Sequence, residues 1–313
     1  MVVPNFSYSD IVVSPEDGGR LHQEGSVLVA DCGSGRFPIK DGIVDLRGAT
    51  SVDEDTLQQM HIFNELAIQD VSFFRPAVYR RFLDLLAQHC RMNESGDDQV
   101  FRFAELGGGE GHCARYIKEN CEGGEVFVCD ISSSALKRAP ATLHRICADI
   151  SRPIFAPDLL EVAVFWVSLH HLAKKQRQLA FENAYRALAN GGVLAVFEPN
   201  AGFILRRLLY RSRFRKDVYV DERESAIDLD EVASLAMTAG FAPLTTVYLN
   251  PPYNFPFVRK LRRWYLYFPA VEVLYYFDRL RGMLRWPCRR KKGGKEAGKR
   301  TSLYGMALYR KPF

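Results

Sequence analysis

The sequence lacks the long apolar segments that a membrane-spanning helix requires. No run reaches the roughly 18 uncharged apolar residues that cross a bilayer, and Met1 to Ser9 lacks the basic start and apolar stretch of a secretory signal. The 7 cysteines are odd in number and scattered, which is unlike a disulfide framework and suits a reducing compartment. Internal repeats are also missing. We therefore expect a globular cytoplasmic protein.

The sequence does have enough length and apolar content for a sizeable core. A chain of 313 residues with 47% hydrophobic content suffices for one α/β domain and a small appendage. The net charge of +5 conceals an asymmetry, because residues 201–313 carry 23 Lys and Arg against 10 Asp and Glu, whereas the first 200 residues carry 19 against 27. The last third of the chain is therefore predicted to face an anionic partner.

Strand-like and helix-like patterns alternate from residue 99 onward. Strands are expected at 100–106, 125–130, 143–149, 161–168, 192–198, 245–249 and 303–309. Helices are expected at 174–189 and 228–239, and others starting at His112 and Ser133. Strands separated by helices of this length predict a doubly wound, mostly parallel sheet of seven strands.

The most informative motif is a strand that runs into a glycine-rich turn at 103–111. Such a turn lets the backbone approach a ligand closely, but its spacing alone also fits a dinucleotide-binding site. The downstream order separates the two alternatives. Glu105 in the motif, Asp130 and Asp149 closing the next two strands, and Asn-Gly-Gly at 190–192 together resemble class I S-adenosylmethionine-dependent methyltransferases, which have a Rossmann-like fold.

This resemblance implies S-adenosylmethionine as the cofactor. The glycines would leave room for its methionine part and Glu105 would face its ammonium group. Asp130 would accept both ribose hydroxyls, because an ionised carboxylate offers two acceptors. Asp149 would take a hydrogen bond from the adenine amino group, although both aspartates could instead be turn residues. The implied cofactor-binding set is Glu105, Gly107, Gly109, Gly111, Asp130, Ile131, Asp149 and Ile150.

Candidate catalytic residues follow the fourth and fifth strands. His170 and His171 lie where the fourth strand reaches its carboxyl end, the edge at which open α/β sheets bind ligands. A histidine there could take a proton from the acceptor or position it, or support the fold, since the resembling family often carries a His pair at this place. Glu198 after the fifth strand is the next candidate, and its carboxylate could equally cap a helix.

The first 50 residues contain short strand-like runs at 10–13, 26–30 and 43–46, separated by glycines. The segment 36–43 and Cys32 resemble the small zinc-ribbon proteins that activate methyltransferases. Those proteins use two C-x-x-C pairs, and three of the four cysteine positions carry other residues here, so a tetrahedral thiolate site cannot form. We therefore expect a ribbon-like module without metal, which could dock a protein partner.

Two insertions, at 201–227 and 250–301, interleave aromatic and basic residues. Such segments suit an anionic membrane interface, where rings lie among headgroups. They also suit RNA, through stacking and phosphate contacts. A third alternative is a covering segment that packs its aromatic side chains on the core, followed by a solvated basic tail.

These patterns divide the chain into a degenerate ribbon-like module at 1–50, a helical linker over the cofactor site at 51–98 and a methyltransferase domain at 99–313. The predicted function is O-methylation of an anionic small-molecule, glycan or lipid-linked acceptor, at the inner face of the membrane. RNA is the less favoured acceptor, because the chain lacks an Asn-Pro-Pro-Tyr/Phe-type catalytic signature at the fourth strand. The Asn-Pro-Pro-Tyr run at 250–253 follows the sixth strand instead. A cofactor-binding scaffold that regulates a partner is the non-enzymatic alternative.

Overall fold

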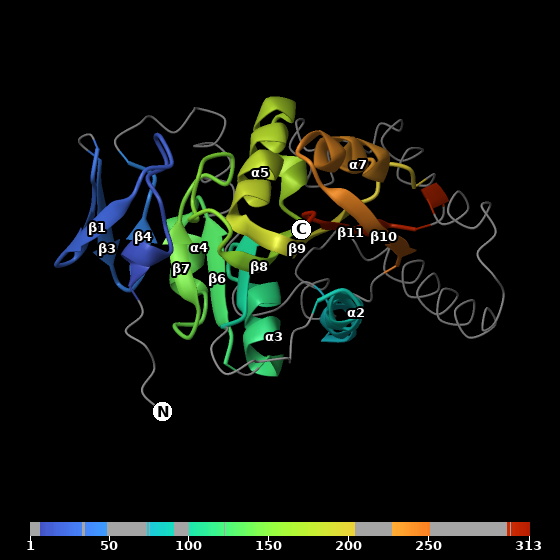
Figure 1. The fold of residues 1–313 in the computed structure, drawn as a ribbon. Coiled ribbons are helices and arrows are strands. Elements are labelled where there is room, and N and C mark those ends of the chain that lie inside the picture. The colour runs from blue at the N-terminus through green and yellow to red at the C-terminus, as the bar shows by residue number, and fades with distance from the viewer. Residues whose placement is uncertain are drawn as a thin grey trace, which may run out of the picture.

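The protein, as a computed structural model, forms one mixed sheet of eleven strands in the order β1-β2-β3-β4-β7-β6-β5-β8-β9-β11-β10 (Figure 1). The structure describes residues 7–32, 35–48, 74, 76–90, 100–121, 123–203, 227–250, 299–300 and 302–313. Much of the helical linker expected at 51–98 and most of the two insertions lie outside these residues. Among the described residues, no helix is both long and apolar enough to cross a membrane.

Seven of the strands form the α/β sheet that the sequence predicted. Neighbouring strands from β7 to β9 are parallel, and β11 lies antiparallel between β9 and β10. Their bounds are β5 Arg102–Leu106, β6 Glu125–Asp130, β7 His144–Cys147, β8 Leu160–Trp166, β9 Leu188–Pro199, β10 Ala242–Leu249 and β11 Tyr304–Arg310. The prediction of a doubly wound, mostly parallel sheet is confirmed.

Helices cover both faces of this sheet. Successive residues of a strand point to opposite sides, so each strand contributes side chains to two apolar cores. In β8, Phe165 packs in one apolar core together with residues of α5 and α7, whereas Val164 packs in a second core together with residues of α2, α3 and α4. Figure 1 shows α5 and α7 on one side of the sheet and α2 and α3 on the other. The helices are α2 Pro76–Ala87, α3 His112–Asn120, α4 Ser133–Arg138, α5 Lys174–Ala187 and α7 Leu229–Thr238.

The front of the chain continues the same sheet. Strands β1 (Leu21–Glu24), β2 (Val27–Ala30), β3 (Arg36–Lys40) and β4 (Ile43–Asp45) pair antiparallel in sequence order, and β4 then pairs parallel with β7. Leu28, Phe37 and Val44 are fully buried in the core that also contains α5. The sequence predicted a β-rich module here but not its junction with the main sheet. The likeness to an activator and the domain boundary near residue 50 stay predictions.

The strand expected at 10–13 is wrong. Residues Tyr8–Asp10 form a short 3-10 helix, η1, because the Tyr8 carbonyl accepts hydrogen bonds from the N–H groups of Ile11 and Val12. These local bonds leave Val12 with a single antiparallel bridge, to Phe155. The segment therefore crosses the loop between β7 and β8 without joining a ladder.

Candidate functional site

The glycine-rich turn between β5 and α3 has a backbone that other residues would strain. Gly107 and Gly111 have φ values of 73° and 70°, in the left-handed region that favours glycine. A Cβ on Gly107 would lie 2.7 Å from the Cβ of Ser168, and one on Gly111 would lie 3.0 Å from Leu143. Residues just after β8 and just before β7 therefore pack directly against this turn.

Gly109 is less crowded than its neighbours. Its φ is 55°, and among the described residues the nearest heavy atom to a Cβ there would be Oδ2 of Asp130, at 4.0 Å. The N–H of Gly109 donates to the same oxygen at 2.8 Å, and the N–H of Ser132 donates to Oδ1 at 2.8 Å. Burial raises the pKa of Asp130, while these two backbone bonds lower it. Each carboxylate oxygen keeps a lone pair for a further donor, such as a ribose hydroxyl.

Glu105 is buried beneath the turn, with 2% of its surface exposed. Gly111, the N-cap residue of α3, has no side chain that could cap the helix. Oε2 of Glu105 caps it instead, because this oxygen accepts the N–H of Ala114 in the first turn of α3 at 2.7 Å. Burial raises the pKa of Glu105 to about 8, against the opposing effect of the backbone N–H groups of Ala114 and Cys113. A cationic ammonium group near this carboxyl would favour its ionised form.

The residues expected around adenine lie at the ends of β6 and β7. Oδ1 of Asp149 accepts the N–H and the hydroxyl of Ser151 at 2.9 and 2.7 Å, so this carboxylate does form a turn. The Cδ1 atom of Ile150 lies 3.4 Å from the Cβ position of Gly107, which brings the end of β7 against the glycine turn. Ile131 is half-buried beyond the end of β6. The predicted cofactor residues thus come together at the carboxyl edge of the sheet.

His170 and Glu198 form a buried pair at the end of β8. Oε2 of Glu198 lies 2.7 Å from Nδ1 of His170, and Oε1 accepts the N–H groups of Ser168 and Leu169 at 2.8 and 2.7 Å. These amides begin the 3-10 helix η2 (Leu169–His171), so Glu198 is the capping group that the sequence allowed as an alternative. Because Glu198 is fully buried, it acts on the turn and on His170.

The connection from β8 to η2 holds a strained residue. Val167 has a φ of 57°, which is costly for a β-branched side chain, and its N–H donates to the Phe197 carbonyl at 2.8 Å. His171 follows in η2, and the centroid of its ring lies 3.9 Å from that of His170. Strain of this kind is typical of turns that carry functional groups.

Arg177 was not predicted as a site residue, although it contacts η2. Its guanidinium Nε donates to the Leu169 carbonyl at 3.0 Å, and the residue is 5% exposed. Its position in the helix could have identified it from the sequence, because Arg177 lies on the same helical face as Ala180, Phe181 and Ala184, which are all buried. A charged residue on an apolar stripe needs a buried partner.

Asp17, His22 and Cys32 are the residues of the front module that could in principle hold a metal without a full set of cysteines. His22 instead lies 2.8 Å from Asp31 through Nδ1. Over the ranges that the structure describes, no group of three or more His, Cys, Asp or Glu could hold a metal ion, and the cysteines there are free thiols. The absence of zinc stays a prediction.

Part of the chain matches a known protein family. Residues 103–192 match the family model of a methyltransferase domain. No curated protein matches the chain. Similar solved structures include phosphoethanolamine N-methyltransferase 2 of Haemonchus contortus in complex with S-adenosyl-L-methionine, at 15% identity over 85% of this chain and 61% of that chain, with a TM-score of 0.49. A second is a methyltransferase of Archaeoglobus fulgidus that depends on S-adenosylmethionine, at 13% identity over 75% of this chain and 93% of that chain, with a TM-score of 0.47. A third is a methyltransferase of Mesorhizobium loti that depends on S-adenosylmethionine, at 15% identity over 69% of this chain and 93% of that chain, with a TM-score of 0.43.

The matched segment contains the glycine turn, Asp130, Asp149 and the His170 turn. Among the described residues, the uncrowded side of Gly109 and the acceptor atoms of Asp130 lie side by side. The chain therefore contains a methyltransferase domain, and the protein is an S-adenosylmethionine-dependent methyltransferase.

Proposed function

We propose that this enzyme methylates an oxygen of an anionic acceptor, with His170 as the general base. The pairing of His170 with Glu198 carries the proposal. Because Glu198 holds Nδ1 at 2.7 Å, Nε2 is the ring nitrogen left to take a proton. When bound, S-adenosylmethionine supplies a methyl group on a positively charged sulfur. His170 would accept the proton that the attacking hydroxyl loses.

The cofactor roles proposed for the carboxyl edge rest on its hydrogen-bond acceptors. Asp130 would bind the ribose hydroxyls while it holds Gly109. Each of its oxygens accepts one backbone N–H and keeps a lone pair for one hydroxyl. Glu105 would face the ammonium group from beneath the turn. Asp149 and Ile150 would contact adenine on one side and Ile131 on the other.

The charge distribution supports an anionic acceptor. Residues 201–313 carry 23 basic against 10 acidic residues, and the aromatic side chains among them suit an anionic membrane surface. A lipid-linked, glycan or other small anionic acceptor fits both features. RNA is the second candidate, because the same basic and aromatic residues suit phosphate contacts and base stacking.

The test uses S-adenosylmethionine carrying a labelled methyl group, incubated with the enzyme and a cell extract that is then divided into lipid, small-molecule, RNA and protein fractions. We expect label in the lipid or small-molecule fraction. Label in RNA would favour the second candidate, and label in no fraction would favour a scaffold that binds the cofactor without transferring its methyl group.

His170→Ala should reduce turnover by about 10² to 10⁴ and leave cofactor affinity within about twofold. His144→Ala is the matched control, because His144 lies at the first position of β7. The role of His170 would be refuted if both variants kept full turnover.

A further inference from the structure

The peptide groups around Leu169 are held from two directions. Its N–H donates to Glu198 at 2.7 Å, and its carbonyl accepts Nε of Arg177 at 3.0 Å. Leu169 directly precedes His170 in η2. The orientation of the His170 ring therefore depends on Arg177 as well as on Glu198.

Arg177 extends this contact to another helix. Its Nη1 lies 2.9 Å from Oε1 of Glu231, which lies in the first turn of α7. The Arg177 side chain is 6% exposed and that of Glu231 is 36% exposed. A buried guanidinium needs its partners, because an unpaired buried charge is costly. The position of Arg177 is thus tied to the first turn of α7.

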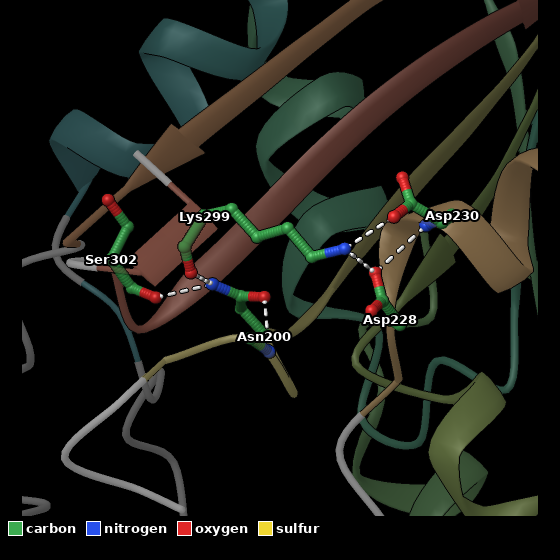
Figure 2. Close-up of polar contacts among 6 residues, drawn as sticks. Asn200, Asp228, Asp230, Lys299 and Ser302 are labelled. Atoms are coloured by element: carbon green, nitrogen blue, oxygen red, sulfur yellow. Dashed lines mark hydrogen bonds and ion pairs between the residues drawn. The ribbon is translucent and has the colours of Figure 1, made fainter. Parts of the chain in front are cut away.

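A lysine also contacts the start of α7. Nζ of Lys299 lies 2.8 Å from Oδ1 of Asp228, the N-cap of α7, and also contacts Asp230 (Figure 2). Burial alone would lower the pKa of Lys299, but the hydrogen bonds to these two carboxylates raise it above its ordinary range. Asp230 is 81% exposed, so Asp228 is the more effective partner.

Lys299 is also joined to the strand that carries Glu198. Its backbone carbonyl accepts Nδ2 of Asn200 at 2.7 Å, and the same amide nitrogen donates to the Ser302 carbonyl at 2.7 Å (Figure 2). Asn200 follows Glu198 by two residues and is fully buried. The contacts therefore close a ring that runs from Glu198 through η2, Arg177, α7 and Lys299 back to the end of β9.

We propose that Arg177 is a positioning residue for His170, and that Lys299 acts on His170 through the first turn of α7. The inference rests on the proposed role of His170 and adds a link from Lys299 to the turn that carries this residue.

The first measurement is hydrogen exchange of the η2 amides, which needs no acceptor. We expect Lys299→Met to accelerate exchange of the Ser168 and Leu169 amides at least threefold, and Arg177→Lys at least tenfold. Lys311→Met is the matched control, since Lys311 directly follows β11 and is a buried lysine whose Nζ lies 2.7 Å from Oδ1 of Asp158. Equal exchange in the Lys299 and Lys311 variants would overturn the link.

The second measurement is a double-mutant cycle on labelled methyl transfer with Arg177→Lys and Lys299→Met. We expect each variant to lower turnover and to leave cofactor affinity within twofold. The loss of turnover in the double variant should be at least threefold smaller than the product of the two single losses. Multiplicative effects would overturn the link. If the two variants accelerate exchange while His170→Ala keeps full turnover, the proposed function fails and the structural ring remains. If His170→Ala abolishes turnover while exchange is unchanged, the ring fails alone.

Discussion

The three carboxylates at the carboxyl edge differ in how well their burial is compensated. Glu198 accepts two backbone N–H groups and pairs with His170, and Asp130 accepts two backbone N–H groups. Glu105 is 2% exposed and accepts the backbone N–H groups of Ala114 and Cys113. The effect of burial outweighs these two bonds and raises the pKa of Glu105 to about 8.

This pKa makes a pH-dependent contribution to stability. Burial raises the pKa of Glu105 from 4.5 to about 8, so its contribution to the free energy of unfolding is complete below pH 4.5 and is lost as the pH rises through 8. The loss approaches about 1.4 kcal/mol for each pH unit within that window. Urea unfolding of the ligand-free protein from pH 5 to pH 8.5 measures it.

Glu105→Gln is the matched control, because glutamine keeps the volume and can still accept the Ala114 N–H without titrating. We expect the slope of stability against pH to be smaller in this variant than in the wild type. The ammonium group of the cofactor should favour ionised Glu105, so cofactor binding below pH 8 is expected to release its proton. Identical slopes in the two proteins would show that Glu105 does not titrate in this range.

At the scale of elements, the glycine turn connects β5 to α3 and packs against Ser168, which follows β8. Gly107→Ala should destabilise the fold for two reasons, a left-handed φ of 73° and a Cβ 2.7 Å from that of Ser168. Gly123→Ala separates these effects, because Gly123 also has a φ of 73° but no described residue lies within 4 Å of its Cβ position.

We expect Gly123→Ala to cost about 1 to 2 kcal/mol and to leave cofactor affinity unchanged. Gly107→Ala should cost about 1 to 3 kcal/mol more, from the steric conflict, and should abolish measurable cofactor binding. Thermal unfolding and calorimetric titration provide the two measurements. Equal behaviour of the two variants would mean that the turn tolerates a side chain at Gly107.

Local patterns predicted the elements of the sheet but not the contacts between distant ones. The bounds of β6 coincide with those expected, since its apolar run begins and ends at charged residues. Glu105 capping α3, Glu198 capping η2 and Arg177 holding Leu169 depend on where strands and helices meet in space. The sequence named Glu105 from a family resemblance and Glu198 from its place after the fifth strand, whereas Arg177 lay outside any motif.

For the molecule as a whole, the continuous sheet predicts that the front module and the methyltransferase domain unfold together. Val44 lies opposite Ile146 of β7 and is fully buried in the core that it shares with Phe181 of α5. Val44→Ala should lower stability by about 2 kcal/mol and leave one calorimetric transition. Val27→Ala is the control, because Val27 lies on β2 and is half-buried. Two transitions, of which one alone shifts, would show that the module is a separate domain.

The charge asymmetry of the whole chain predicts recruitment to anionic membranes. Residues 201–313 carry 13 more basic than acidic residues, and each cation near an anionic surface adds about 1 kcal/mol of attraction, so four acting together would give measurable binding that weakens with salt. Trp264 and Phe268, outside the described residues, would insert among headgroups. We therefore expect co-sedimentation with vesicles rich in anionic lipid but not with neutral ones, and Trp264→Ala with Phe268→Ala should reduce it. RNA added as competitor separates the alternatives, because complete displacement by RNA, or no sedimentation at low salt, would contradict the membrane prediction.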